Sequence, residues 1–289
     1  MKKSIALFVT ISFLFIVVGI LGTILYFSQK LTENKNFYIA QNSVLIKGAL
    51  ETLGKITKEI NSSDQLKAIF STFPISDENG NFRAVYTITP LFDRVDLNSY
   101  LKNGKINKTV DFYIDNILEY YEIQDPVFFK DLLLDTLDTD TEEREAYSEI
   151  ILQNPDFQNG KIHSYEELYK IEKYYAKITE DKSIFEIPWK KLVFFGDGRK
   201  HIIECSLLNK KTAQFMGLVF EGKPTCKNIL TPQNKQMAEK FDIIEFNNTN
   251  DFWINVEIDY FYNELHHTID IIYNIHNKKV VSVESDPVY

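Results

Sequence analysis

Residues 5–27 read IALFVTISFLFIVVGILGTILYF, a run of 23 residues without a charged side chain, and only MKKS precedes it. At a helical rise of about 1.5 Å per residue, such a run exceeds the roughly 30 Å hydrocarbon thickness of a bilayer. Lys2 and Lys3 favour an amino terminus in the cytoplasm. We therefore expect residues 5–27 to form a transmembrane helix in contact with lipid, and the rest of the chain to lie on the far side of the membrane.

A cleaved secretory signal is the alternative interpretation of this run. The apolar core of a signal usually has about 7–15 residues and ends at a small-x-small cleavage site. Here the run is longer and ends with Ile24-Leu25-Tyr26-Phe27. Both features favour an anchor over a cleaved signal.

The charge is distributed unevenly along the chain. Residues 1–60 hold seven Lys and three Glu, a balance of +4, so the other 229 residues carry −9 − 4 = −13. A surface that binds nucleic-acid phosphates needs a surplus of Lys and Arg. We therefore expect no direct binding of nucleic acid by the outer part of the chain.

The helical pattern continues beyond the membrane run. Residues 28–60 contain no proline, and apolar side chains recur every three or four positions, at Leu45, Ala49, Leu53, Ile56 and Ile60. Such spacing marks one face of an α-helix. The sequence thus predicts a single helix of about 55 residues, half in lipid and half packed on a folded domain.

Strand patterns occupy two separate parts of the chain. Residues 82–89 are rich in β-branched and aromatic side chains, and apolar residues alternate with mostly polar ones over 252–262 and 265–275, with a shorter run at Val281 and Val283. Asn263-Glu264 and Asn277-Lys278 stand where hairpin turns belong. We expect an antiparallel meander with one apolar face, covered by the amphipathic half of the first helix.

Between these strands the pattern is helical, with segments predicted near residues 107–123, 126–136, 144–153 and 165–176. Ser164 and Glu167 have the spacing of a capping box at the start of the last segment. The predicted fold is therefore α+β: a long amino-terminal helix on a small antiparallel sheet, built from residues 28–97 and 201–289, with an all-helical domain inserted at residues 98–200.

This plan is that of type IV pilins and pseudopilins, and four passages resemble one family among them, the minor pseudopilin K of type II secretion (general secretion pathway protein K). They follow the family's order and are residues 3–7 (KSIAL), 82–98 (FRAVYTI, then FDRVDLN), 135–140 (DTLDTD) and 159–168 (NGKIHSYEEL). The family's I-N-V-N-T-A segment is not preserved near residues 202–206, which leaves the packing there open.

The resemblance implies processing at the amino terminus. Residues 1–4 would be a leader that a prepilin peptidase removes between Ser4 and Ile5, although Ser4 stands where the family usually has glycine. Most pseudopilins carry a glutamate at the position of Val9, which pairs with the neighbouring subunit in the fibre. An unpaired carboxylate in hydrocarbon is costly, so an apolar Val9 fits a subunit at the tip.

The resemblance also implies a function. It is that of a non-enzymatic minor pseudopilin at the tip of a pseudopilus, initiating fibre assembly for protein secretion, or for DNA uptake by a related machine. It implies a single-pass protein of the bacterial inner membrane with a periplasmic domain. Its partners would be other minor pseudopilins, the inner-membrane assembly platform and the prepilin peptidase. The alternative function is that of a membrane-anchored extracytoplasmic sensor or binding module, which would signal to a partner through its membrane helix.

One segment is strongly acidic. Between residues 131 and 149 a single Arg144 stands among eight acids, namely Asp131, Asp135, Asp138, Asp140, Glu142, Glu143, Glu145 and Glu149. Ca²⁺ prefers such oxygen ligands, but the spacing is not that of an EF-hand. By themselves the residues favour a solvated acidic loop. The resemblance to a family whose helical domain binds calcium points instead to a Ca²⁺ site, with Asp138 and Asp140 as its ligands.

Other site chemistry is sparse. Cys205 and Cys226 are the two cysteines, and outside the cytoplasm they are free to oxidise, so the sequence leaves open whether they pair. His266 and His267 are neighbours on a predicted strand and face opposite sides. The spacings of serine hydrolases, zinc peptidases and P-loops are absent from the sequence. We therefore expect that the chain is not an enzyme.

Overall fold

The computed structural model describes residues 36–56, 63–70, 72–76, 82–198, 202–245, 253–262, 265–275 and 279–285. The chain forms two compact units: unit 1 comprises Met1–Pro90 with Phe246–Tyr289, and unit 2 comprises Leu91–Glu245. The predicted membrane helix at residues 5–27 lies outside the described residues. Within the described ranges, no helix has the length and apolar character needed to cross a membrane.

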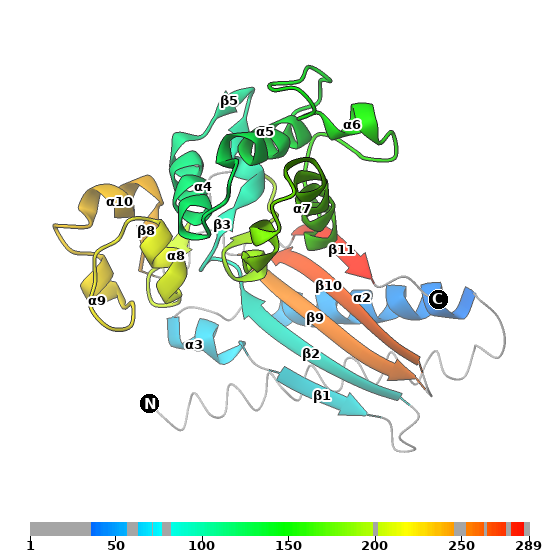
Figure 1. Cartoon of the computed structure of the whole chain (residues 1–289). Coiled ribbons are helices and arrows are strands. Elements are labelled where there is room, and N and C mark those ends of the chain that lie inside the picture. The colour runs from blue at the N-terminus through cyan, green and yellow to red at the C-terminus, as the bar shows by residue number, and fades with distance from the viewer. Residues whose placement is uncertain are drawn as a thin grey trace. The chain divides into compact units, whose positions relative to one another are not determined.

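Unit 1 contains an antiparallel sheet of five strands in the order β1-β2-β9-β10-β11 (Figure 1). Their bounds are β1 Thr72–Ser76, β2 Phe82–Pro90, β9 Trp253–Tyr262, β10 Leu265–Asn274 and β11 Lys279–Ser285. β2 pairs directly with β9, from Phe82↔Tyr262 to Pro90↔Ile254. The pairing confirms that the strand predicted at residues 82–89 belongs to the same sheet as the carboxyl-terminal meander.

Burial alternates along the strands as the sequence predicts. The side chains of one face are buried, at Ala84, Tyr86, Ile88, Ile254, Val256, Ile258, Tyr260, Ile269, Ile271 and Tyr273. β10 pairs with β9 from Leu265↔Tyr262 to Asn274↔Trp253, and the predicted turns at 263–264 and 277–278 lie outside the described residues. Period-two patterning therefore determines both the strands and their register.

The helices of unit 1 are α2 (Asn36–Ile56) and the short α3 (Ser63–Ala68). α2 lies within the predicted helix of residues 28–60. On it Ala49 and Leu53, one turn apart, are 4% and 3% exposed. These two positions belong to the apolar face that the sequence predicts.

Unit 2 contains helices and three small two-stranded sheets. Its helices are α4 Lys108–Tyr120, α5 Pro126–Leu137, α6 Ile150–Gln153, α7 Tyr165–Thr179, α8 Lys210–Phe215, α9 Cys226–Ile229 and α10 Lys235–Lys240, with 3₁₀ turns at Leu97–Ser99, Ser183–Glu186 and Trp189–Lys191. The strand pairs are β3–β6 (Val95–Asp96, Val193–Phe194), β4–β5 (Leu101–Lys102, Lys105–Ile106) and β7–β8 (Ile203–Glu204, Ile243–Ile244). The inserted unit is thus mainly helical and not all-helical.

The limits of unit 2 differ from the predicted 98–200. Its single apolar core includes residues of α4, α5 and α7 and also later ones, among them Ile203, Cys205, Phe215, Met216 and Ile243. Because these later side chains complete the same core, the insertion continues to Glu245. Burial of apolar surface, and not helical periodicity, sets the boundary of a compact unit.

The helix predicted at residues 144–153 is present only over Ile150–Gln153. Tyr147 adopts a positive φ of 70°, which a helix does not allow. Arg144 and Ser148 instead bind the buried carboxylate of Asp135. A contact with a distant residue therefore overrides the local helical preference.

Candidate metal centre

Two of the passages that resemble the K family meet at the end of α5. Asp138 is the C-cap residue of this helix, and the Gly160 amide donates to the carbonyl oxygen of Thr136 at 2.8 Å. The Asn159 Nδ2 atom donates to Glu149 Oε1 at 2.7 Å and to the carbonyl oxygen of Asp140 at 3.2 Å. Residues 138–140, 149 and 159 therefore form one cluster, which we call the acidic cluster.

Three oxygens of the acidic cluster are buried without a partner. They are Asp138 Oδ1, Glu149 Oε2 and Asn159 Oδ1, and within the described part of the chain none of them has a well-formed hydrogen bond. Burial raises the pKa of the Asp138 and Glu149 carboxyls, and the backbone at Asp140 and Ile151 partly offsets this effect. A buried acceptor left unsatisfied costs about 1–3 kcal/mol, more when it is charged. Such groups in a folded protein usually have water or an ion as a partner.

Arg144 neutralises part of the cluster. Its Nη1 atom pairs with Oδ1 of the fully buried Asp135 and lies 2.6 Å from Asp138 Oδ2. The other oxygen of Asp135 accepts from Ser148 Oγ at 2.5 Å and from the Arg144 amide at 3.2 Å. Asp135 is thus fully engaged in fixing the loop, whereas Asp138 keeps one oxygen free.

The electrostatics of the cluster favour an additional cation. Burial, together with the negative charges of Asp140 and Glu149, raises the pKa of Asp138 to about 6. Burial also raises the pKa of Glu149. Both shifts mean that the ionised carboxylates are disfavoured where they stand, and a bound cation would reverse this effect.

The donor set fits a hard cation such as Ca²⁺, which takes six to eight oxygen ligands. Asp138, Glu149 and Asn159 offer side-chain oxygens, and the chain adds carbonyl groups. Among the described residues, three ligand atoms of His, Cys, Asp or Glu come within 4.8 Å of one another only at Glu204, Cys205 and Cys226. The acidic cluster is therefore an assembled set of oxygens, and not a closed cage of carboxylates.

The two predicted ligands, Asp138 and Asp140, differ in burial and in hydrogen bonding. Asp138 lies at the unpartnered oxygens, whereas Asp140 is exposed and its Oδ1 atom accepts from the Glu142 amide at 3.0 Å. Sequence reasoning missed Glu149 and Asn159. Asn159 opens the 159–168 passage that resembles the K family, which could have pointed to it. Nothing in the acidic run distinguishes Glu149 from its neighbours.

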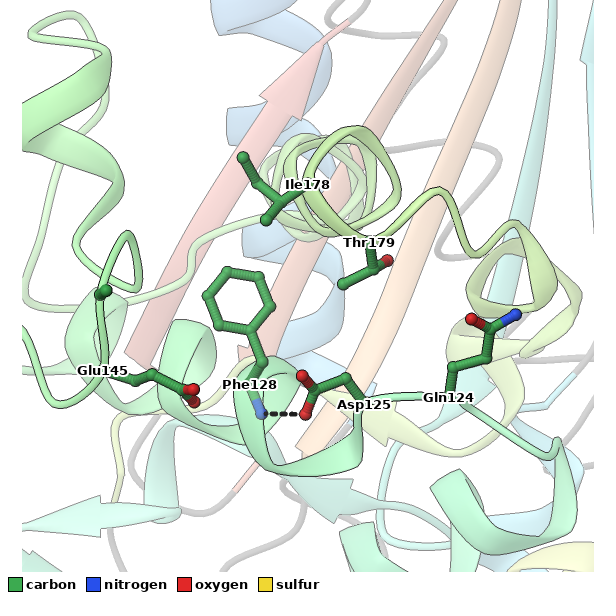
Figure 2. Close-up of a pocket in the computed structure, with 7 residues that line it drawn as sticks. Gln124, Asp125, Phe128, Glu145, Ile178 and Thr179 are labelled. Atoms are coloured by element: carbon green, nitrogen blue, oxygen red, sulfur yellow. Dashed lines mark hydrogen bonds between the residues drawn. The ribbon is translucent and has the colours of Figure 1, made fainter.

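A hollow of about 420 Å³ lies beside the acidic segment (Figure 2). Figure 2 shows Ile178 facing the Phe128 ring, with the carboxylates of Glu145 and Asp125 on either side. Asp125 is already used as the N-cap of α5, because its Oδ1 atom accepts from the Phe128 amide at 3.0 Å. Gln124, Ala146 and Thr179 complete the lining. These side chains combine apolar and acidic surface without a nucleophile–base pair.

The two cysteines, whose pairing the sequence left open, are joined. Cys205 directly follows β7 and Cys226 is the first residue of α9, and the two form a disulfide within unit 2. The predicted cleavage site at Ser4 and Ile5, in contrast, lies outside the described residues.

Comparison with known proteins gives a match among solved structures. No family model matches the sequence, and no curated protein is similar to it. Among solved structures, a chain of the GspK-GspI-GspJ complex from the type 2 secretion system of enterotoxigenic Escherichia coli is similar, with a TM-score of 0.58 and 10% sequence identity. The match covers 88% of this chain and 99% of that chain. The match over this length shows that the chain shares the fold of that solved chain, a combination of helices and a small sheet.

Proposed function

We propose that this protein is a minor pseudopilin of a type II secretion-like machine. In this role it is a structural subunit, not an enzyme, which caps the pseudopilus and initiates its assembly. The fold match carries the proposal, because it extends over nearly the whole of the solved chain. The order of the sequence passages that resemble the K family supports it independently.

The proposed arrangement in unit 1 is that of a pilin. The helix of residues 28–60, of which α2 is the described part, covers the apolar face of the five-stranded sheet. Burial of Ala49 and Leu53 supports this arrangement, as does the continuous buried row on β2, β9 and β10. The helix continues into residues 5–27, which anchor the protein in the bacterial inner membrane and leave both units in the periplasm.

The insertion of unit 2 between β2 and β9 supports a place at the tip. A bulky unit inserted between two strands of the sheet would obstruct the addition of a further subunit, and Val9 offers no carboxylate to one. Gly19 and Gly22 allow neighbouring membrane helices to approach closely. The solved neighbour is a chain of the GspK-GspI-GspJ complex. By analogy we expect two or more smaller minor pseudopilins, the assembly platform and the prepilin peptidase as partners here.

We further propose that the acidic cluster binds one Ca²⁺ ion. Asp138 Oδ1, Glu149 Oε2 and Asn159 Oδ1 are the oxygens that would hold it, because they are buried and lack a well-formed hydrogen bond. The ion would neutralise the surplus charge and fix residues 138–160 to the end of α5. Its role would be to stabilise this surface of unit 2.

Thermal unfolding of the full chain with and without Ca²⁺ tests this site. Ca²⁺ at a hundred times its dissociation constant should stabilise the protein by about 2.7 kcal/mol. Asp138→Asn and Glu149→Gln should abolish the stabilisation. Glu142→Gln is the matched control, since Glu142 is an exposed acid of the same segment. No stabilisation of the wild type, or equal stabilisation in all four proteins, would contradict a site at the unpartnered oxygens.

Processing tests the pseudopilin assignment itself. Amino-terminal sequencing of protein from cells with the prepilin peptidase should begin at Ile5, and from cells without it at Met1. An intact Met1 in both strains would count against the proposed function. The genes beside this one would show whether the machine secretes proteins or takes up DNA.

A further inference from the structure

The buried Glu204 has one carboxylate oxygen, Oε1, to which the neighbouring disulfide cannot donate a hydrogen bond. Glu204 is fully buried, and its Oε2 atom accepts from the amide and hydroxyl of Ser206 at 2.8 and 2.6 Å. Among the contacts of the described residues, the one polar neighbour of Oε1 is Cys226 Sγ at 4.0 Å. A sulfur in a disulfide carries no hydrogen, so it cannot donate to this oxygen. Glu204 Oε1 is therefore a buried carboxylate oxygen without a donor.

Three ligand atoms converge at this place. One carboxylate oxygen of Glu204 and the sulfurs of Cys205 and Cys226 all lie within 4.8 Å of one another. In tetrahedral zinc coordination the ligand atoms lie about 3.3–3.8 Å apart. The two sulfurs are bonded to each other in the disulfide, so they would have to separate by about 2 Å once it opens, while the Glu204 oxygen is already nearby.

The ligand atoms stand on fixed backbone. The Glu204 amide donates to the Phe92 carbonyl at 2.9 Å, and the Cys205 amide donates to the Ile244 carbonyl at 3.0 Å. Cys226 begins α9, which Thr225 and Asn228 cap reciprocally. Ser206 orients the carboxylate from outside the cluster, in the way that hydrogen-bonded neighbours orient metal ligands.

We propose that Glu204, Cys205 and Cys226 bind one thiophilic divalent cation, of which zinc is the type, whenever the disulfide is open. Thiolate and carboxylate ligands suit Zn²⁺, and the cation would neutralise the otherwise donorless Glu204 oxygen. The cluster then has two exclusive forms, a disulfide and a metal-bound dithiolate. This site is separate from the acidic cluster, whose ligands are all oxygens, and it does not depend on the pseudopilin assignment.

The conversion between the two forms is a thiol–disulfide exchange. A low-molecular-weight disulfide oxidises the two thiols, so that one S–S bond forms in the protein, one breaks in the oxidant, and two small thiols are released. A cation held by both sulfurs must leave before this exchange is complete. Bound metal should therefore slow the closure of the disulfide.

The test titrates the metal-free full chain with Cd²⁺, a zinc-like probe with a thiolate absorption band, in excess Ca²⁺ to occupy oxygen sites. The chain reduced with a phosphine should bind one Cd²⁺ with this band, and the oxidised chain should show none. Cd²⁺ should also raise the thermal midpoint of the reduced chain alone. A reduced chain that binds Cd²⁺ no better than the oxidised one, or is not stabilised by it, would overturn the proposal.

The carboxylate ligand is tested by substitution. Glu204→Gln keeps both thiols and should weaken Cd²⁺ binding by about tenfold or more. Glu221→Gln, at an exposed acid of the same unit, should bind like the wild type. If Glu204→Gln and wild type bind Cd²⁺ equally, the metal would be held by flexible thiols and not by this site. Equal rates of disulfide closure with and without Cd²⁺ would also contradict it.

Discussion

Asp96 organises the start of unit 2 through backbone contacts. Its carboxylate is 3% exposed and accepts from the amides of Asn98, Gly196 and Gly198 at 3.0, 2.8 and 3.1 Å. Asn98 in turn binds the carbonyls of Gly196 and Ile162. The amides of Gly196 and Gly198 thus face a buried carboxylate about a hundred residues earlier in the chain, and β6 runs parallel to β3.

Substitution of Gly196 tests this arrangement. A Cβ atom there would lie 2.4 Å from Asp96 Oδ2 and 2.8 Å from its Cγ. Gly196→Ala should therefore lower the free energy of unfolding by about 1–3 kcal/mol. Gly54→Ala is the control, since nothing lies within 4 Å of that Cβ position in α2 and alanine favours a helix. Chemical denaturation measures both, and equal stability of the two variants would contradict the role of Asp96.

Glu172 gives the protein a predictable pH response. It is 5% exposed, burial raises its pKa to about 7, and Trp189 Nε1 donates to its Oε1 atom at 2.8 Å. Since the folded-state pKa is raised, the contribution of Glu172 to stability is complete below about pH 4.5. It is lost progressively as the pH rises to about 7.

Glu172→Gln should remove this pH dependence. The amide keeps an acceptor for Trp189 and carries no charge, so the variant should be more stable than wild type at pH 7, by about 2 kcal/mol, and about equal to it below pH 4.5. Glu166→Gln, at an exposed site of the same helix, should change little. Unfolding curves across this range measure the difference. A gain of the same size at low pH would show that the ionisation of Glu172 is not its cause.

At the scale of single elements, local patterns predict those parts whose partners are near in sequence. α4, α5 and α7 lie where the 3.6-residue period places them. The Ser164 hydroxyl accepts from the Glu167 amide as predicted, although the Glu167 carboxylate binds the His163 amide instead of closing the box at Ser164. The segment 144–149 fails as a helix because Asp135, on another element, binds it. Local helix propensity therefore predicts a helix correctly only where no buried residue of another element binds the same segment.

The cap of α7 at Ser164 should contribute to the stability of the fold. Ser164→Ala removes the acceptor for the Glu167 amide at 3.0 Å and should cost about 1 kcal/mol. Ser164→Asp keeps an acceptor and adds a favourable charge at the helix start, so it should retain wild-type stability. Thermal unfolding of the three proteins measures the effect. A loss of equal size in both variants would show that the cap is not what Ser164 contributes.

At the scale of the whole molecule, the sequence predicts a sheet interrupted by an insertion, because β2 and β9 share the period of one apolar face. It does not predict where the insertion ends. That limit depends on which side chains complete the core of unit 2, and those of residues 203–243 do. The candidate metal centre is likewise predicted only in part from the sequence. The acidic composition and the DTLDTD passage point to Asp138, whereas Glu149 and Asn159 join it only through folding.

Removal of unit 2 tests the independence of unit 1. Pro90 pairs with Ile254, so the two ends of the insertion leave adjacent strands. A short glycine-containing turn in place of unit 2 and the adjoining residues 246–252 of unit 1 should therefore leave a sheet that unfolds cooperatively, as observed by circular dichroism. Ile258→Asp in this shortened chain is the control and should abolish the transition, since Ile258 is fully buried. A shortened chain without a cooperative transition would show that the sheet depends on unit 2.

In its proposed function the protein caps a heteromeric assembly. The most direct measurement is native mass spectrometry of the full chain, purified in detergent with the smaller pseudopilins encoded beside it, in the presence and absence of Ca²⁺. We predict a complex with a single copy of this chain and at least one smaller pseudopilin. Homopolymers of this chain, or no binding of any co-encoded pseudopilin under either condition, would contradict the assignment to the tip.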